Sequence, residues 1–126
     1  MRQTVTPYLL YEDAEAALEW LSTAFGFREQ DRITGPDGAV AHAEMDVGDG
    51  SSIFLGGPGG DYRNPKVVGR TALVYVYVDD ADAHCARARE AGAEIAEEPN
   101  DQPYGDRRYA AEDPEGHFWY FATPLE

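Results

Sequence analysis

The sequence has little cysteine, little lysine and no long apolar run. Its 126 residues contain one cysteine, Cys85, and only one of its ten basic residues is a lysine, Lys66. A lone cysteine excludes an internal disulfide framework and is compatible with a reducing cytoplasm, where we expect the protein. No apolar run approaches the ~20 residues of a membrane-spanning helix, and the N-terminus lacks the apolar stretch of a secretory signal. We therefore expect no membrane partner.

Positive charge is also scarce. Twenty-four carboxylates face ten Lys plus Arg, which gives a formal net charge of −14. Nucleic-acid binding usually requires a positive field that displaces counterions, so no nucleic-acid partner is expected. A negative field would steer cationic small molecules toward the protein, although the same charge also serves solubility alone. With 43% hydrophobic and 12% aromatic residues, the chain can build a folded core.

An internal repeat divides the chain into two halves. The sequence Asp-Ala-Glu-Ala at Asp13 recurs as Asp-Ala-Asp-Ala at Asp80, an offset of 67 residues. Such a repeat predicts two copies of one structural unit that share a core. The region between them is rich in glycine and proline, which is typical of a linker. We expect one domain, residues 1–126, with modules at about 1–56 and 71–126 and a linker at 57–70.

Each module is predicted to follow the order βαβββ, which makes the fold class α+β. In each, a strand precedes an acidic N-cap, an amphipathic helix and three further strands. The clearest strand signal is the strict alternation over Val40–Val47, with His42 and Glu44 on its polar face. The predicted elements are strand Val5–Tyr11, a helix from Asp13 to about Phe25, strands Glu29–Thr34, Val40–Val47 and Ser52–Leu55, strand Ala72–Val78, helix Asp80–Ala91, a short strand near Glu94–Ala96, a loop through Pro99 and Pro103, and strands Arg107–Glu112 and His117–Ala122.

The sequence predicts structural roles for three residues with reactive side chains. Cys85 shares a helical face with Ala81 and Ala88, so it is predicted to fill the core rather than to act as a nucleophile. His84 is expected near the solvent face of the same helix. His117 follows an Asp-Pro-Glu-Gly turn and is expected to hydrogen-bond the backbone of that turn.

Six short motifs occur along the chain in a fixed order. They are Val5–Asp13 (VTPYLLYED), Ala24–Phe27 (AFGF), Val76–Asp80 (VYVDD), Ala91–Glu94 (AGAE), Tyr104–Arg107 (YGDR) and Asp113–His117 (DPEGH). With these motifs, the chain resembles the vicinal oxygen chelate superfamily over essentially its whole length, most closely the glyoxalase/bleomycin-resistance (PhnB-like) branch. The resemblance implies two modules that form a curved mixed sheet around a pocket, and a homodimer with pockets shared across subunits. It does not decide the activity, because this fold hosts isomerases, dioxygenases, fosfomycin-inactivating transferases and drug-binding proteins.

The resemblance also implies four positions for a divalent metal. Enzymes of the family take one ligand, usually His or Glu, from the first and the last strand of each module. Counted from the motifs, these positions hold Thr6, Phe54, Leu73 and Tyr120. Because two of the four are hydrocarbons and none is His or Glu, we expect no metal and no other cofactor.

A pocket between the modules would be lined largely by aromatic side chains with hydroxyl groups. Such walls suit a flat or extended ligand, although aromatic residues on strands can equally be ordinary core. Arg107 and Arg108 point to opposite faces, and the sequence leaves open which one meets the pocket. The predicted lining is Thr6, Tyr8, His42, Glu44, Phe54, Leu73, Tyr75, Tyr77, Tyr104, Arg108, Phe118 and Tyr120.

These observations favour a metal-free protein that sequesters a small aromatic or cationic molecule, such as an antibiotic or a metabolite. The alternative is a metal-dependent lyase, isomerase or dioxygenase with relocated ligands, and a third is an interaction domain without a pocket. The only pair suited to proton transfer is His42 with Glu44, which lie two apart on one strand face. The simpler interpretation is that His42 and Glu44 form a solvated or substrate-facing pair.

Overall fold

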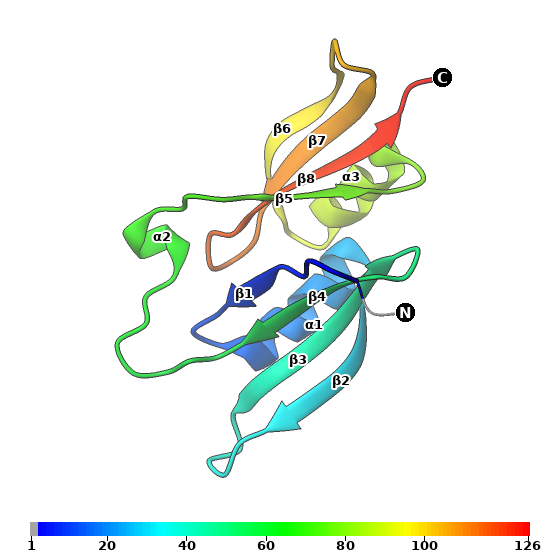
Figure 1. The fold of residues 1–126 in the computed structure, drawn as a ribbon. Helices are drawn as coiled ribbons and strands as arrows, with labels where there is room; N and C mark the ends of the chain where they lie inside the picture. The colour runs from blue at the N-terminus through cyan, green and yellow to red at the C-terminus, as the bar shows by residue number, and fades with distance from the viewer. Residues whose placement is uncertain (1–2) are drawn as a thin grey trace.

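The computed structural model describes residues 3–126, which form two four-stranded sheets (Figure 1). The strand order is β1-β4-β3-β2 in the first sheet and β5-β8-β7-β6 in the second. In each sheet the first strand of the module runs parallel to the last, and the other pairs are antiparallel. Both modules thus form a mixed sheet with the same topology, as the repeat predicts.

The elements follow the predicted order. The first module contains β1 (Tyr8–Leu10), α1 (Ala14–Phe25), β2 (Arg28–Thr34), β3 (Val40–Gly48) and β4 (Ser51–Gly56). The linker contains α2 (Pro65–Val68), and the second module contains β5 (Val74–Tyr77), α3 (Ala81–Glu90), β6 (Glu94–Asp101), β7 (Asp106–Glu112) and β8 (Phe118–Pro124). The acidic caps are confirmed, because the carboxylates of Asp13 and Asp80 accept the backbone N–H groups of Ala16 and Ala83.

Two element predictions are corrected. The predicted loop through Pro99 belongs to β6, which is longer than expected. Proline is tolerated there because β6 lies at the edge of its sheet and pairs only with β7. The linker is not wholly irregular, since Pro65 starts the one-turn helix α2, a position in which its missing N–H has no cost.

The two sheets do not pair edge to edge. Within residues 3–126 all strand pairing stays inside one module, and α1 and α3 pack against each other on the covered sides of the sheets (Figure 1). His84 of α3 lies in this contact: its Nε2 donates to the Phe25 carbonyl at 2.9 Å, and its Nδ1 accepts from the Tyr109 hydroxyl. The expectation of a solvent-facing His84 is therefore wrong, because its ring lies between Phe25 of the first module and the side chains of Tyr109 and Phe121 on its own sheet.

The core lies between each sheet and its helix and is continuous between the modules. Phe25 of α1 contacts Trp119 and Phe121 of β8, with ring centroids 5.5 and 4.6 Å apart. Cys85 is buried with Ala81 and Ala88, as predicted. The aromatic contacts across the boundary explain how two small modules share enough apolar surface to fold as one domain.

A buried carboxylate ties the two modules together. Asp113, in the turn between β7 and β8, is 2% exposed. Its Oδ2 accepts the hydroxyl of Tyr11 at 2.6 Å and the indole N–H of Trp119 at 3.2 Å. Its Oδ1 accepts the backbone N–H groups of Glu115 and His117 at 3.1 and 3.0 Å. These four donors stabilise the charge, and one of them comes from the first module.

The same turn also holds the start of α1 and the linker. The carboxylate of Glu115 accepts the backbone N–H groups of Glu12 and Asp13 at 2.6 and 2.9 Å. The imidazole of His117 donates to the Leu10 carbonyl at 2.7 Å, in the other module rather than in its own turn as expected. Gly116 has φ 95°, and a Cβ at this position would lie 2.5 Å from a linker backbone nitrogen, so only glycine fits.

Removal of the Tyr11 hydroxyl should destabilise the fold. Tyr11→Phe leaves the buried Asp113 carboxylate one donor short, which should lower the free energy of unfolding by about 1.5–3 kcal/mol. Urea denaturation measures the change. The matched control is Tyr62→Phe, because the Tyr62 hydroxyl donates to a carbonyl at an exposed site and should contribute about 1 kcal/mol or less. Equal losses in the two variants would contradict the role given to Asp113.

His84 should make stability depend on pH. Burial lowers the pKa of His84 in the folded protein. The unfolded chain then binds more protons just below the ordinary histidine pKa of about 6.5, so the free energy of unfolding should fall as the pH decreases from about 6.5. Urea denaturation at a series of pH values tests this. His84→Gln should flatten the slope in that window, and an unchanged slope in this variant would contradict the assignment.

Candidate functional site

Each sheet is covered by a helix on one face and leaves the other face open. On the first sheet the open face carries Tyr8, His42, Glu44 and Phe54, from β1, β3 and β4; we call these four residues the N-face. The ring of Phe54 meets the rings of Tyr8 and His42 in T-shaped contacts, with centroids 5.9 and 5.1 Å apart. These four predicted site residues are therefore brought together.

Hydrogen bonds connect three residues of the N-face in a row. His42 Nε2 lies 3.1 Å from Glu44 Oε2, and His42 Nδ1 lies 2.7 Å from the hydroxyl of Tyr8. An ionised carboxylate can only accept, so the imidazole proton belongs on Nε2. In the neutral imidazole, Nδ1 then accepts the proton of the Tyr8 hydroxyl. The row is Tyr8 to His42 to Glu44, with each proton donated toward the carboxylate.

The open face of the second sheet carries a hydroxyl network around Asp106. Asp106 is 5% exposed, and its Oδ2 accepts the hydroxyls of Tyr75 and Tyr77 at 2.7 and 2.8 Å. The Tyr75 hydroxyl is also 3.2 Å from that of Tyr104. Burial, together with the bonds to Tyr104 and Asp106, raises the pKa of Tyr75, and the bond to Asp106 raises the pKa of Tyr77. The carboxylate thus orients two phenols on this face.

Arg108, not Arg107, lies on this open face. Its guanidinium stacks over the ring of Tyr120 at 4.1 Å, donates to the Tyr104 hydroxyl at 2.8 Å and pairs with Glu97 at 3.1 Å. Arg107 lies on the covered side, where it pairs with Asp82 of α3. We call the open set on the second sheet the C-face, which consists of Tyr75, Tyr77, Tyr104, Arg108, Phe118 and Tyr120.

Phe118 forms a second stack of the same kind at the start of β8. The guanidinium of Arg70 lies 4.3 Å from the centroid of its ring and also pairs with Glu112. The ring of Phe118 also meets that of Tyr120, with centroids 5.5 Å apart. The C-face therefore carries two arginine–aromatic stacks side by side, each with a carboxylate partner.

The N-face and the C-face are two clusters rather than one lining. Within residues 3–126, no hydrogen bond or ring contact links a residue of one to a residue of the other. Thr6 and Leu73, the other predicted lining residues, lie just before β1 and β5 and outside the strands. One chain therefore places the predicted site on two surfaces.

The four positions at which the family holds metal do not fit a divalent ion. Leu73 and Phe54 offer no donor atom, and the ring of Phe54 packs against two other rings of the N-face. Tyr120 lies beneath the cationic Arg108, which opposes a second positive charge. Among the residues that the structure describes, no three His, Cys, Asp or Glu side chains gather closely enough to hold a metal ion.

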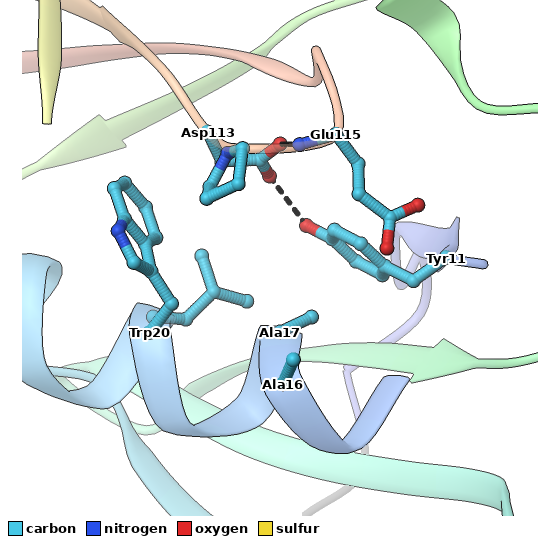
Figure 2. Close-up of a pocket in the computed structure, with 8 residues that line it drawn as sticks. Tyr11, Ala16, Ala17, Trp20, Asp113 and Glu115 are labelled. Carbon is cyan, nitrogen blue, oxygen red and sulfur yellow. Dashed lines mark hydrogen bonds between the residues drawn. The ribbon is translucent and has the colours of Figure 1, made fainter. Parts of the chain in front are cut away.

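Three cavities lie near these clusters. A hollow of about 300 Å³ between the modules is lined by Tyr75 and Tyr77 of the C-face and by the β3–β4 turn. A second hollow, of about 420 Å³, shares Tyr77 and the β3–β4 turn and extends to His84. Figure 2 shows the third cavity, between α1 and the turn that holds Asp113; its volume is about 140 Å³. The third contains no predicted site residue, and the Asp113 carboxylate at its wall is already bound to four donors. The two hollows between the modules are therefore the ones that involve the predicted site.

Sequence reasoning missed two carboxylates on the C-face. Asp106 lies two residues before Arg108 on β7, so strand alternation from Arg108 could have placed it on the same face. Glu97 could not be found in this way, because β6 contains register shifts between Ile95 and Asn100. Its pairing with Arg108 depends on those shifts.

Comparison with known proteins agrees with the fold. The family model described as "Glyoxalase/Bleomycin resistance protein/Dioxygenase superfamily" matches residues 4–121. The chain is 33% identical to the uncharacterized protein Rv0887c of Mycobacterium tuberculosis, over 96% of this chain and 74% of that one.

Solved structures give the same result. TioX from Micromonospora sp. ML1 is similar over 98% of this chain and all of its own, with 34% identity and a TM-score of 0.79. A glyoxalase/bleomycin resistance protein/dioxygenase from Nocardioides is similar over all of this chain and 86% of its own, with 26% identity and a TM-score of 0.71. No helix in residues 3–126 has the length and apolar character to cross a membrane.

The charge of Asp106 should control the ionisation of its two tyrosines. Asp106→Asn keeps the shape of the side chain but removes the negative charge, so the pKa of Tyr75 and that of Tyr77 should both decrease toward the ordinary value. Titration followed by phenolate absorbance or by tyrosine Cζ NMR shifts measures this. Asp101→Asn, at an exposed site on β6, is the control and should change neither. An unchanged Tyr77 in Asp106→Asn would argue against this network.

Proposed function

The chain belongs to the glyoxalase/bleomycin resistance protein/dioxygenase superfamily, and we propose that it binds a small aromatic or cationic molecule on its two open sheet faces. The binding uses rings and hydroxyls rather than a metal ion, because two of the family's four metal positions are hydrocarbons. The observation that carries this proposal is the set of polar-tipped aromatic residues on faces that no helix covers. Tyr77 and Tyr104 are 58% and 60% exposed.

Exposure of this kind is unusual for large rings. Aromatic side chains contribute large contact areas at interfaces, and exposed apolar patches commonly mark binding surfaces. The C-face also holds its groups in fixed orientations, because Asp106 binds Tyr75 and Tyr77 while Arg108 is stacked and bonded on three sides. Groups that are already oriented lose less entropy when a ligand binds. Both features support a ligand-binding surface.

The role that fits such a surface is sequestration of an antibiotic or a metabolite. The net charge of −14 favours the approach of a cationic molecule over an anionic one. The rings favour a flat body in that molecule. The buried single thiol of Cys85 is compatible with action in the cytoplasm.

The working unit in this proposal is a homodimer with pockets shared across the subunits. The open faces carry exposed apolar groups that a single chain leaves in water, including Tyr8 and Tyr77, and Leu73 just before β5 is exposed as well. A second copy that places its C-face opposite the N-face of the first would cover both. Two such pockets would then form in each dimer, since the arrangement is reciprocal.

Binding should depend on both faces. Calorimetric screening of aromatic cations at low and moderate salt should yield ligands whose affinity falls about tenfold or more in Tyr75→Ala and in Phe54→Ala, because each variant removes a stacking surface worth roughly 1–3 kcal/mol. The control is Val67→Ala on α2, where the side chain is exposed and lies off both faces. Affinities that stay the same in both face variants would refute the proposed site.

A further inference from the structure

We propose that the N-face is the receptor for a protonated amine of the ligand, with the oxygen of Tyr8 as its hydrogen-bond acceptor and the carboxylate of Glu44 as its counter-charge. This inference rests on the proposed function and assigns one chemical group of the ligand to one surface. It follows from the direction of the hydrogen bonds, from the free oxygen of Glu44, and from the difference in charge between the two faces.

The direction of the hydrogen bonds leaves Tyr8 as an acceptor. In the neutral imidazole of His42, Nε2 donates to Glu44, so Nδ1 accepts the hydroxyl proton of Tyr8 at 2.7 Å. The lone pairs of the Tyr8 oxygen therefore face outward without a proton to offer. Tyr8 is 48% exposed, so a ligand can reach that oxygen. A group with N–H donors satisfies it, whereas a carbonyl or a carboxylate would be opposed.

Glu44 adds a negative charge to the same face, on the other side of the His42 ring. Only its Oε2 is bound, by His42, and within residues 3–126 no hydrogen bond or ion pair engages Oε1. Asp46, two residues along β3 on the same face, differs because Arg28 binds it at 2.7 Å and the backbone of Gly48 at 2.8 Å. Among these two carboxylates, Glu44 is the one that no arginine neutralises. Its side chain is 35% exposed and can meet a cation.

The groups that could meet an amine are already engaged on the C-face. There the guanidinium of Arg108 covers the ring of Tyr120 and pairs with Glu97, and the carboxylate of Asp106 accepts two phenols. The N-face carries no Lys or Arg among its four residues, and the ring of Phe54 beside Tyr8 offers an apolar wall and a negative ring face. A primary alkyl- or arylammonium group at Tyr8 thus finds a hydrogen-bond acceptor, an aromatic wall and, across the His42 ring, a carboxylate.

Two aromatic cations separate hydrogen bonding from simple charge attraction. Benzylammonium has three N–H donors, whereas benzyltrimethylammonium has the same ring and charge but none. NMR titration of the full-length protein with each probe gives the affinities. Tyr8→Phe should weaken benzylammonium binding about tenfold, the value of one hydrogen bond to a charged group, and leave the quaternary probe unchanged within about twofold. Glu44→Gln should weaken both probes, because it removes the charge.

The controls separate this assignment from the proposed function. Tyr62→Phe removes a linker hydroxyl that donates to the Leu10 carbonyl and belongs to neither face, so it should leave benzylammonium affinity unchanged. One contrary result is that benzylammonium binds the unmodified protein and loses affinity in Tyr75→Ala, but keeps its affinity in Tyr8→Phe and in Glu44→Gln. That result would place the amine elsewhere and leave the proposed binding function standing. If Tyr8→Phe weakens both probes equally, the acceptor role of Tyr8 is wrong. If neither probe nor any other aromatic cation binds at millimolar concentration, both proposals fail.

Discussion

The buried carboxylate of Asp113 fixes how the two halves of this protein meet. A charge at a 2% exposed position is stable only when donors surround it, and the four donors here are two backbone N–H groups of a turn, an indole and a phenol. Because the phenol belongs to Tyr11, which directly follows β1 of the other module, all four donors are present only when the two modules meet at this turn. The α1–α3 contact and the bond from His117 to Leu10 are consistent with that arrangement.

This arrangement determines where function can lie. The modules meet through their helices and turns, so each sheet keeps one face free of protein. A strand sends alternate side chains to opposite faces, which places Trp119 and Phe121 in the core and Tyr120 between them on the open face. Because the modules meet through their helices and turns, the aromatic residues on the open face of each sheet stay exposed. Had the sheets met edge to edge, part of these faces would have been covered within one chain.

Local patterns in the sequence predicted the topology, whereas side-chain environments that depend on long-range contacts could not be predicted. The Asp-Ala repeat and the alternation over β3 and β8 depend only on neighbouring residues, so they identified the modules and the side chains on each face. His84 and Asp106 were misjudged or missed because their environments come from distant segments: α1 covers His84, and the tyrosines of β5 surround Asp106. No spacing in the sequence records which turn approaches which helix, so the role of Asp113 was not visible either.

Two of the positions at which the family holds metal carry aromatic residues in this chain. Phe54 packs its ring against Tyr8 and His42, and Tyr120 supports Arg108 and contacts Tyr75. Each ring therefore stands at the centre of a cluster and holds a hydrogen-bonding partner in place. A dication would polarise a ligand oxygen directly, whereas rings and oriented hydroxyls align a ligand through contacts and hydrogen bonds. The polarity of these clusters differs between an acceptor-rich N-face and an arginine-bearing C-face, and this difference is the basis of the recognition that we propose.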